Sequence, residues 1–562
     1  MELPTLDLDQ IPDPATRGAA QQLLHLLEQL YAQLQALQAE NQRLRDEIRR
    51  LTGQSPRPTF PTPRSPQSSS RPDTDLSSEA ERREPKPHRK RPKLQRIVLD
   101  REEVLPVDPA MLPADAEFKG YEAVVVQDLK LVTDNVLFHK AVYYSPSLGR
   151  RFLAELPAGY TGQYGPHLRT LTLVLHHAGQ MSEPQIHALL QDAGIVIARG
   201  TVSRFLLAGH ERFHAEAQAV LVAGMASSPW QQVDVTPTRV NGRNEACHVL
   251  CNPLYTAYQT TPAQDRLTVI AVLQGDVPRR YRLDEMAWAY LREAGVSQKL
   301  LGAVQALAAS RAPALEWDEA GFGEMLDAEV AWAGPGQRQR VLEAGAFAAY
   351  WAQEAITPVH TLVCDDAPQF QGITPSLSLC WVHDGRHYKK LRPLLPQHQR
   401  QVAAFRKRYW NYYRKLRAYQ QAPTAEEATR LEREFDALFR TETGLAMLDE
   451  RIGRTRAKKA ALLWVLEHPE LPLTNNAAEL GARQRVRKRD VSFGPRTGAG
   501  KQAWDTFQTL GATATKLGVS FYRYVHDRVS GACRLPSLAA VIEEQARVLN
   551  LGASWAPSRA SP

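Results

Sequence analysis

The stretch TLVCDDAPQF, residues 361–370, is an apolar run of four residues that ends in two consecutive carboxylates. A short apolar run bounded by polar residues predicts a buried strand. We expect this strand to span 359–364 and to deliver Asp365 at its end, with Asp366 as the neighbouring alternative. The stretch therefore predicts a sheet with an acidic group at the end of one strand.

Two other carboxylates lie in comparable surroundings. Asp234 lies in WQQVDVTPTRVNG (230–242), which predicts a strand that ends in a turn. Glu479 closes LTNNAAE (473–479), which precedes the basic run RQRVRKR (483–489) and predicts a helix. Two strand-end carboxylates and one helix carboxylate offer the hard oxygen ligands that Mg²⁺ and Mn²⁺ prefer. Such a set can hold two divalent ions for the in-line displacement at a phosphodiester.

The order of the expected elements indicates the fold class. The expected elements are strands at 230–235, 246–260 and 266–274, helices over about 283–355, and a fourth strand at 359–364. A helix with Glu479 follows after a long gap. This order predicts an α/β RNase H-like core, and the helical pattern of 384–470 predicts a helical insertion into it.

Composition limits the class of protein. The chain has 562 residues, which predicts several domains, and 43% of them are apolar, enough for buried cores. Its longest apolar runs fall short of the roughly 18 residues that span a bilayer, and the acidic N-terminus has no signal-peptide pattern. Five cysteines in so long a chain argue against a disulfide framework and favour a reducing cytosol. The net charge of +8 suits a polyanionic partner.

Two segments carry a family resemblance. PLTNNAAELGAR (472–483) and CWVH (380–383) resemble segments of the insertion-sequence-66 (TnpC-type) bacterial DDE transposases. The chain has Thr474 and Leu480 where that family has Asp and Arg, and it lacks the family's N-terminal cysteine pairs. The resemblance implies that Asp234, Asp365 and Glu479 are the catalytic residues and the ligands of two Mg²⁺ (or Mn²⁺) ions.

The string at 365–370 is also similar to the second-aspartate segment of retroviral-type integrases, which favours Asp365 over Asp366 as the ligand. Cys380 and His383 are either a zinc pair or, as the preferred interpretation, a structural contact near the active site.

The resemblance implies a specific activity. A DDE transposase binds the ends of a mobile element, hydrolyses a phosphodiester at each end and joins the freed 3′-hydroxyl to target DNA. We expect double-stranded DNA as the partner, no membrane association, and a place in the bacterial cytoplasm at the nucleoid. A non-catalytic DNA-binding regulator derived from a transposase is the alternative, and a resolving-type nuclease without strand transfer is a third possibility.

Basic and small polar side chains are expected to contact DNA phosphates. Since an α-helix turns 100° per residue, Arg483 and Arg487 share a face with Glu479, and Arg483 is expected near the scissile phosphate. The glycine-rich segment 494–502 is expected to be a flexible basic loop. The predicted DNA contacts are Arg483, Arg485, Arg487, Lys488, Arg496, Lys501, Thr201, Ser203, Arg204, Lys389 and Lys390.

Residues 166–225 are predicted to be a helical DNA-binding region. SEPQ (182–185) combines an N-cap, a first-turn proline and a capping-box glutamine. Gly194 is expected to end that helix, and Thr201 begins the next. Two short helices about such a turn indicate a helix-turn-helix, although any helical hairpin gives the same pattern.

Residues 20–52 are predicted to be a leucine-zipper coiled coil. The leucines that recur every seven residues are Leu23, Leu30, Leu37, Leu44 and Leu51. Asn41 at a core position favours a parallel two-stranded pairing, and hence a homodimer or higher oligomer. The alternative is an amphipathic helix that packs on its own domain. A Pro/Ser-rich basic linker (53–98) follows, either a solvated tether or one that binds nucleic acid.

The remaining boundaries complete the predicted organisation. They are a small mixed element at 99–165, the first part of the core at 230–383, the helical insertion at 384–470, the Glu-bearing helix with the basic C-terminal part of the core at 471–530, and a tail at 531–562. In the insertion, cations alternate with Tyr409, Trp410, Tyr412 and Tyr413. These rings either stack on unpaired bases or form an ordinary helical core.

Overall fold

The computed structural model describes residues 97–555, apart from 114–115, 161, 276 and 311–315, together with part of the chain between residues 13 and 44. A five-stranded mixed sheet lies at the centre, in the order β5-β4-β3-β8-β9. Its strands are β3 (Trp230–Val240), β4 (Arg243–Cys251), β5 (Thr256–Thr261), β8 (Thr361–Cys364) and β9 (Ser376–Leu379).

The first three strands are antiparallel, whereas β8 and β9 run parallel to β3. The β3–β4 hairpin turns at Asn241 and Gly242, which both have positive φ angles of 49° and 75°. Asparagine and glycine adopt this conformation at little cost, so the sequence pair favours a tight hairpin here. The core is thus a mixed α/β structure, as the element order predicts.

Helix α18 (Gly498–Lys516) covers the free edge of β5. Thr513, Thr509 and Asp505 accept hydrogen bonds from the backbone N–H groups of Thr256 (3.2 Å), Tyr258 (3.0 Å) and Thr260 (2.8 Å). Four residues of helix rise about 6 Å and two residues of strand about 6.6 Å, so side chains spaced by four match N–H groups spaced by two. This pairing protects an edge that otherwise invites other strands.

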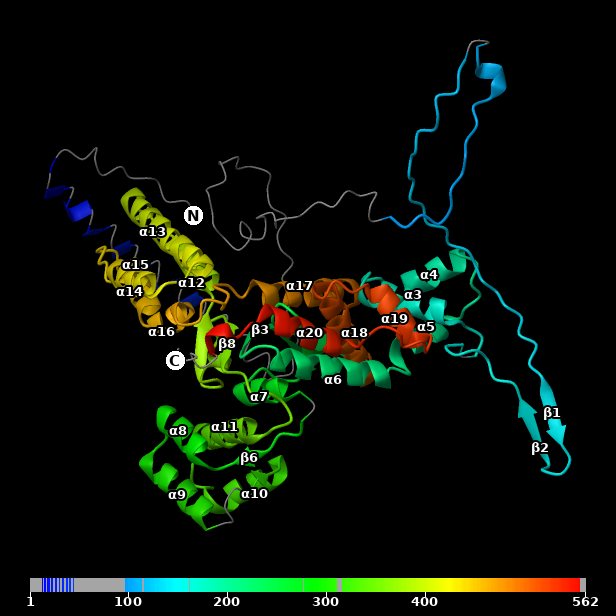
Figure 1. Ribbon diagram of the computed structural model, residues 1–562. Coiled ribbons are helices and arrows are strands. Elements are labelled where there is room, and N and C mark those ends of the chain that lie inside the picture. Colours follow the sequence, from blue (N-terminus) through cyan, green and yellow to red (C-terminus); the bar gives the residue numbers. More distant parts are fainter. Residues whose placement is uncertain are drawn as a thin grey trace, which may run out of the picture.

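Two helical segments are inserted between elements of the core (Figure 1). The first, between β5 and β8, contains α7 (Arg266–Gln274), α8 (Glu285–Glu293), α9 (Gln298–Ala309), α10 (Glu319–Glu329) and α11 (Pro335–Ala352), with the short strands β6 (Tyr281–Arg282) and β7 (Glu316–Trp317). The second, between β9 and α17 (Asn476–Ser492), contains α12 (Trp381–Lys390), α13 (Pro396–Gln421), α14 (Ala425–Phe439), α15 (Ala446–Arg456) and α16 (Lys459–Leu463). Helices thus occupy most of the range 384–470, where a helical insertion was predicted.

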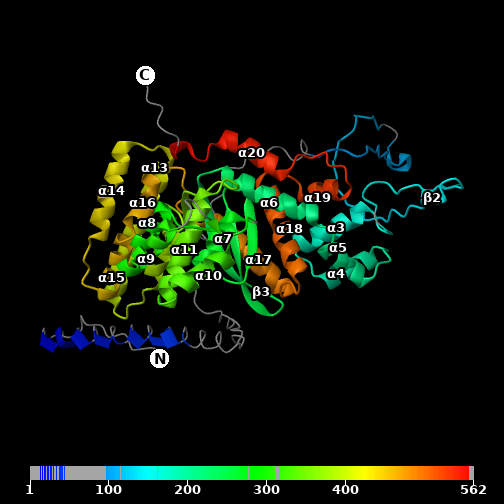
Figure 2. The ribbon, with the colours of Figure 1, turned by 90° about the horizontal axis from the view of Figure 1, so that it is seen from below.

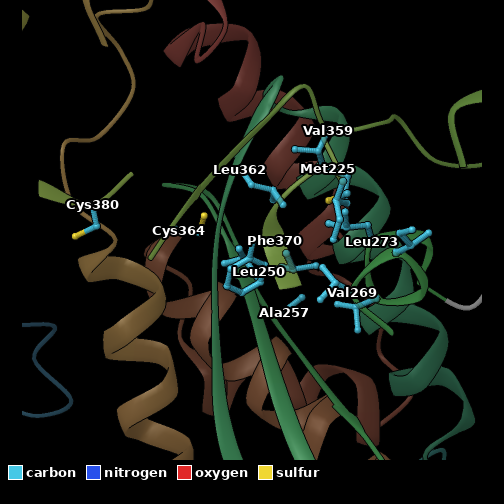
Figure 3. Close-up of a cluster of buried hydrophobic side chains, with 14 of the residues drawn as sticks. Met225, Leu250, Ala257, Val269, Leu273, Val359, Leu362, Cys364, Phe370 and Cys380 are labelled. Atoms are coloured by element: carbon cyan, nitrogen blue, oxygen red, sulfur yellow. The ribbon is translucent and has the colours of Figure 1, made fainter. Parts of the chain in front are cut away.

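The strand predicted at 266–274 is wrong, because these residues form α7. The side chain of Asp265 accepts a hydrogen bond from the backbone of Thr268 at 2.8 Å, which caps the helix, and Gly275 ends it with a φ of 63°. A short apolar run is compatible with either a strand or a buried helix, and here the caps decide. Figure 3 shows Val269 and Leu273 of α7 in the buried cluster with Leu250 and Ala257 of the sheet.

The predicted C-terminal tail also contains a packed helix. Helix α20 (Leu538–Leu549) packs on α6 (Glu211–Ala226), and Leu538 and Ile542 are fully buried. Trp230 at the start of β3 donates a hydrogen bond from Nε1 to the carbonyl of Leu551 at 2.8 Å. Residues 538–551 are therefore part of the folded core.

Both views place α3 (Pro166–His177), α4 (Glu183–Asp192), α5 (Arg199–Leu207) and α19 (Phe521–Val529) at the end of the molecule opposite α12–α16 (Figures 1 and 2). The predicted cap is confirmed, since Ser182 and Gln185 form a capping box at the start of α4. The segment before α3 contains η3 (Pro109–Met111) and one two-stranded hairpin, β1 (Val142–Ser145) with β2 (Arg150–Leu153).

The predicted zipper lies only partly within the described residues. The described positions between 15 and 44 are helical, and Leu23, Leu27, Leu30, Leu34, Leu37 and Leu44 are 46–66% exposed. The last heptad leucine, Leu51, and residues 53–96 of the predicted linker lie outside the described residues. Pairing of two zippers remains a prediction.

Candidate active site

The register of the sheet brings the two aspartates to the same level. Gln232 of β3 pairs with Val363 of β8 in the parallel ladder. Two residues farther along each strand are Asp234 and Asp365. Because side chains alternate along a strand, positions two apart point to the same face. The two carboxylates therefore lie side by side on one face of the sheet.

Helix α17 brings the third carboxylate to the same place. Gln232 donates a side-chain hydrogen bond to the carbonyl of Thr474 at 2.8 Å, and Asn475 donates one to the carbonyl of Val233 at 2.7 Å. These bonds attach the beginning of α17 to β3 immediately before Asp234. Glu479, one turn later, is 8% exposed.

Gly481 allows α17 to lie close to the sheet. A Cβ atom at this position would lie 2.7 Å from Cγ1 of Val249 on β4, closer than two carbon atoms can approach. Tyr258 of β5 donates a hydrogen bond to the carbonyl of Gly481 at 3.2 Å. The missing side chain thus permits the helix position that carries Glu479.

The three carboxylates influence one another electrostatically. Burial raises the pKa of Asp234 to about 7, with further increases from the negative charges of Asp365 and Glu479, while Arg386 and a backbone hydrogen bond oppose the change. Groups of like charge in a poorly solvated site favour protonation or a bound cation. The donor set of three converging carboxylates fits a hard divalent cation.

Asp366 differs from its neighbour. Asp365 is half-buried and faces the other two carboxylates, whereas Asp366 is exposed and pairs with Lys458 at the start of α16. The geometry favours Asp365 as the member of the acidic cluster, in agreement with the sequence comparison of the two positions.

Helix α12 forms the opposite wall of the site. Nη2 of Arg386 lies 3.2 Å from Oε2 of Glu479, and Nε2 of His383 lies 3.6 Å from Oε1. The sulfur of Cys380 accepts a hydrogen bond from the backbone N–H of Asn475 at 3.2 Å. Burial raises the pKa of the Cys380 thiol to about 12 and lowers the pKa of His383, so that both are neutral at pH 7.

Trp381 fixes the start of α12, residues 380–383, against the core. Its side chain is fully buried and donates a hydrogen bond from Nε1 to the carbonyl of Leu462 at 2.9 Å. Its backbone N–H donates to Leu473 at 3.0 Å, just before α17. Arg386 was missed as a site residue by sequence reasoning; its position three residues after His383, on the same helix face, is the signal that points to it.

The cations of the basic run fall on two faces of α17. Arg483 and Arg487 are exposed, as the predicted contact with DNA requires. Arg485 is 0% exposed, pairs with Asp505 and lies 4.0 Å from the centroid of the Trp504 ring. The prediction that Arg485 contacts DNA is therefore wrong, because the side chain belongs to the core between α17 and α18.

The prediction that Lys488 contacts DNA is also wrong, because its side chain is buried. It is 2% exposed and donates hydrogen bonds to the carbonyls of His176 and, at 3.3 Å, Met181, at the C-terminal end of α3. Burial without a carboxylate partner among the described residues lowers its pKa to about 7. The residue attaches α17 to the predicted DNA-binding helices.

The segment 494–502 is only partly a loop. Helix α18 begins at Gly498, and the side chain of Thr497 caps it by accepting from the backbone of Gly500 at 3.0 Å. Lys501 pairs with Glu245 at 3.1 Å and is thus engaged within the protein. Arg496 remains exposed.

The other predicted DNA contacts are spread over two elements. On α5, Arg204 is exposed, Thr201 is half-buried, and Ser203 is half-buried and donates a hydrogen bond to Glu183 of α4. On α12, Lys389 and Lys390 are both exposed. Lys390 is close enough to the acidic site to influence the pKa of His383.

The aromatic residues of α13 belong to the core. Tyr409, Trp410, Tyr412 and Tyr413 are between 1% and 8% exposed. Trp381 packs against Tyr409 and Tyr412 at ring-centroid distances of 5.5 Å. Base stacking by these rings is therefore excluded in this conformation, and only the cations on the outer face of α13 are open to a phosphate backbone.

The comparison with known proteins agrees with this arrangement. A family profile described as "Transposase IS66 family" matches residues 350–503, which include Asp365, Arg386 and Glu479. The chain is also 32% identical over 330 residues to "Uncharacterized protein y4jO" of Sinorhizobium fredii (strain NBRC 101917 / NGR234), across 58% of this chain and 100% of that protein. The chain belongs to the IS66 family of transposases.

Membership of the IS66 family confirms the resemblance noted in the sequence. It implies a transposase-related function, DNA binding and a general dependence on divalent metal ions. Within the part of the chain that the structure describes, no helix is both long enough and apolar enough to cross a membrane.

Proposed function

We propose that this IS66-family chain is a catalytically active DDE transposase with an RNase H-like core. The observation that carries the proposal is the convergence of Asp234, Asp365 and Glu479 from two adjacent parallel strands and the first turn of α17. The strand order, with three antiparallel strands followed by two parallel ones, supports an RNase H-like core.

Each carboxylate has a distinct role in this proposal. Asp234 and Asp365 would be shared ligands of two Mg²⁺ or Mn²⁺ ions, and Glu479 would complete the second site. When bound, such ions activate a water or a 3′-hydroxyl and stabilise the leaving oxygen of the displacement. The chain itself keeps the carboxylates at fixed positions and withdraws Glu479, which is 8% exposed, from bulk water.

Arg386 would stabilise the site when no metal is bound. In the absence of metal, its guanidinium partly balances the three negative charges through its ion pair with Glu479. Once the charges are balanced by metal, the same cation is free to bind a phosphate oxygen of the DNA beside the reaction. Exposed Arg483, one turn after Glu479, would hold the flanking phosphate.

The DNA would cross α17 between the two ends of the molecule. The exposed cations proposed to contact it are Arg204, Lys389, Lys390, Arg483, Arg487 and Arg496. The helical pair α4–α5 would bind the element end as a helix-turn-helix, and the N-terminal zippers of two chains would pair to bring two ends together. The exposed leucines of the described zipper positions support this pairing.

Cleavage of an element end with its flanking DNA tests the proposal. The full chain should nick this substrate in Mg²⁺ or Mn²⁺ but not in EDTA. Asp234→Ala, Asp365→Ala and Glu479→Ala should each abolish cleavage and strand transfer while they retain end binding. Asp366→Ala is the matched control, because Asp366 pairs with Lys458 outside the cluster. End binding without cleavage by the unmodified chain would favour the regulator instead.

A further inference from the structure

Cys380, His383 and Glu479 form a second, chemically different group of ligands beside the acidic cluster. One ligand atom from each residue, a sulfur, an imidazole nitrogen and a carboxylate oxygen, lies within 4.8 Å of the other two. We propose that these three side chains bind one soft divalent cation, for which Zn²⁺ is the natural probe.

The donor types select the metal. Thiolate and imidazole ligands favour Zn²⁺ over Mg²⁺, which prefers oxygen. Zn–S bonds are about 2.3 Å and Zn–N or Zn–O bonds about 2.0–2.2 Å long. In a tetrahedral site these bond lengths place ligand atoms about 3.3–3.7 Å apart, so the group, whose atoms lie within 4.8 Å of one another, must contract to close on a metal. Three protein ligands leave one position open, as in zinc sites that also bind water or substrate.

The surroundings of each ligand suit this role. Burial raises the pKa of the Cys380 thiol, and backbone hydrogen bonds from Asn475, His383 and Val382 to its sulfur oppose that rise in part. A bound cation would supply the remaining stabilisation of the thiolate. Burial keeps the imidazole of His383 neutral, as a ligand must be. Binding would release the thiol proton to solvent.

Arg386 would orient the carboxylate from outside the group of ligands. Its Nη2 lies closer to Oε2 of Glu479 (3.2 Å) than to Oε1 (3.5 Å), while His383 faces Oε1. Oε1 is thus directed to the ligand group and Oε2 is held by the guanidinium. Such partners of metal ligands commonly strengthen metal binding.

The shared residue links this site to catalysis, a consequence that rests on the proposed function. Glu479 belongs to both groups of ligands, so a soft cation bound by it with Cys380 and His383 would compete with the Mg²⁺ pair for the same carboxylate. Zn²⁺ is therefore expected to inhibit Mg²⁺-dependent cleavage, and Cys380→Ser is expected to reduce that inhibition.

Co²⁺ titration of the metal-free full chain tests the site by a readout that does not depend on DNA cleavage. Co²⁺ bound to a thiolate gives a charge-transfer absorption in the near ultraviolet, which we expect at one equivalent per chain and which Zn²⁺ should remove. Cys380→Ser should lose this band. The control Cys533→Ser, at an exposed cysteine far along the chain, should keep it.

A second variant keeps the test valid if Cys380→Ser fails to fold. His383→Ala removes a side chain that is 25% exposed, so the fold should survive, as circular dichroism would verify. It should weaken Zn²⁺ binding by at least roughly 10–100-fold. Absence of the thiolate band in the unmodified chain, or its persistence in Cys380→Ser, would overturn the site. Asp234→Ala should abolish cleavage yet keep the band, so the failure of either proposal is distinguishable from that of the other.

Discussion

The two faces of α17 carry the same types of residue in opposite environments. On one face, Arg483 and Arg487 are exposed beside the acidic cluster. On the other, Arg485 and Lys488 are almost completely buried, one paired with Asp505 and the other bonded to backbone carbonyls. The exposed cations are available to a ligand, whereas the buried ones connect the core to α18 and α3. Equal charge in one basic run therefore does not mean equal function.

Glu479→Gln should give the largest effect on activity. The change removes one negative charge from the cluster without changing the shape of the side chain. We expect turnover of a flanked-end substrate to fall by roughly 10³-fold or more, with the thermal unfolding midpoint unchanged or raised. Asp490→Asn, an exposed acidic position on the same helix, should leave both quantities unchanged. Normal cleavage by Glu479→Gln would remove this residue from the catalytic set.

Arg485→Ala should give the largest effect on stability. Removing one partner of a buried ion pair leaves Asp505 without its cation and costs about 3–5 kcal/mol of unfolding free energy. Chemical denaturation measures this loss. Arg487→Ala, two residues away and exposed, should change the unfolding free energy by less than about 0.5 kcal/mol. A stable Arg485→Ala protein with weakened DNA binding would reverse the assignment of the two faces.

Lys488→Met should change how stability depends on pH. Burial lowers the folded pKa of Lys488 to about 7, below the ordinary value of 10.5. Between these values the unfolded chain binds more protons than the folded chain, so this group makes stability rise with pH from about 7 to about 10.5. The variant should lose that part of the slope. Unfolding measured at several pH values checks this, and an unchanged slope would show that Lys488 is not buried as described.

Arg483→Ala and Arg487→Ala should give smaller effects, on DNA binding and turnover alone. Each is expected to lower the salt dependence of end binding by about one unit of slope. Arg489, which donates a hydrogen bond to the carbonyl of Pro237 at 2.6 Å, is partly engaged within the protein. Arg489→Ala should therefore cost less turnover than the other two. Equal losses at all three positions would indicate a diffuse electrostatic contact without positioning at the scissile phosphate.

Much of the site was accessible from local sequence. An apolar run that ends in a carboxylate, as at 361–365, predicts a strand with its functional group at the end. The capping residues of α4 and the helical pattern after Asp384 could also be predicted from the sequence, because caps and periodicity are local properties. The family resemblance rested on 380–383 and 472–483, and the family profile confirms it.

Other features needed long-range contacts. The apolar residues 269–273 fit a strand or a helix equally well, and only packing against the sheet makes them the buried face of α7. Lys501 looked like a phosphate ligand, but Glu245, more than 200 residues away in the chain, pairs with it. The aromatic residues of α13 match both a base-stacking surface and a core, and only the packing around Trp381 decides between them.

The sequence by itself determined the family, the strand that ends at Asp365 and the three candidate carboxylates, because each of these depends on a few neighbouring residues. Only the tertiary structure decided which cations are buried, that Asp365 and not Asp366 faces the cluster, and that Arg386, His383 and Cys380 meet Glu479. The physical reason is that burial and charge neutralisation depend on partners from distant elements. The helix sets the direction of each side chain, and the packing of distant elements decides whether that side chain is buried, paired or exposed.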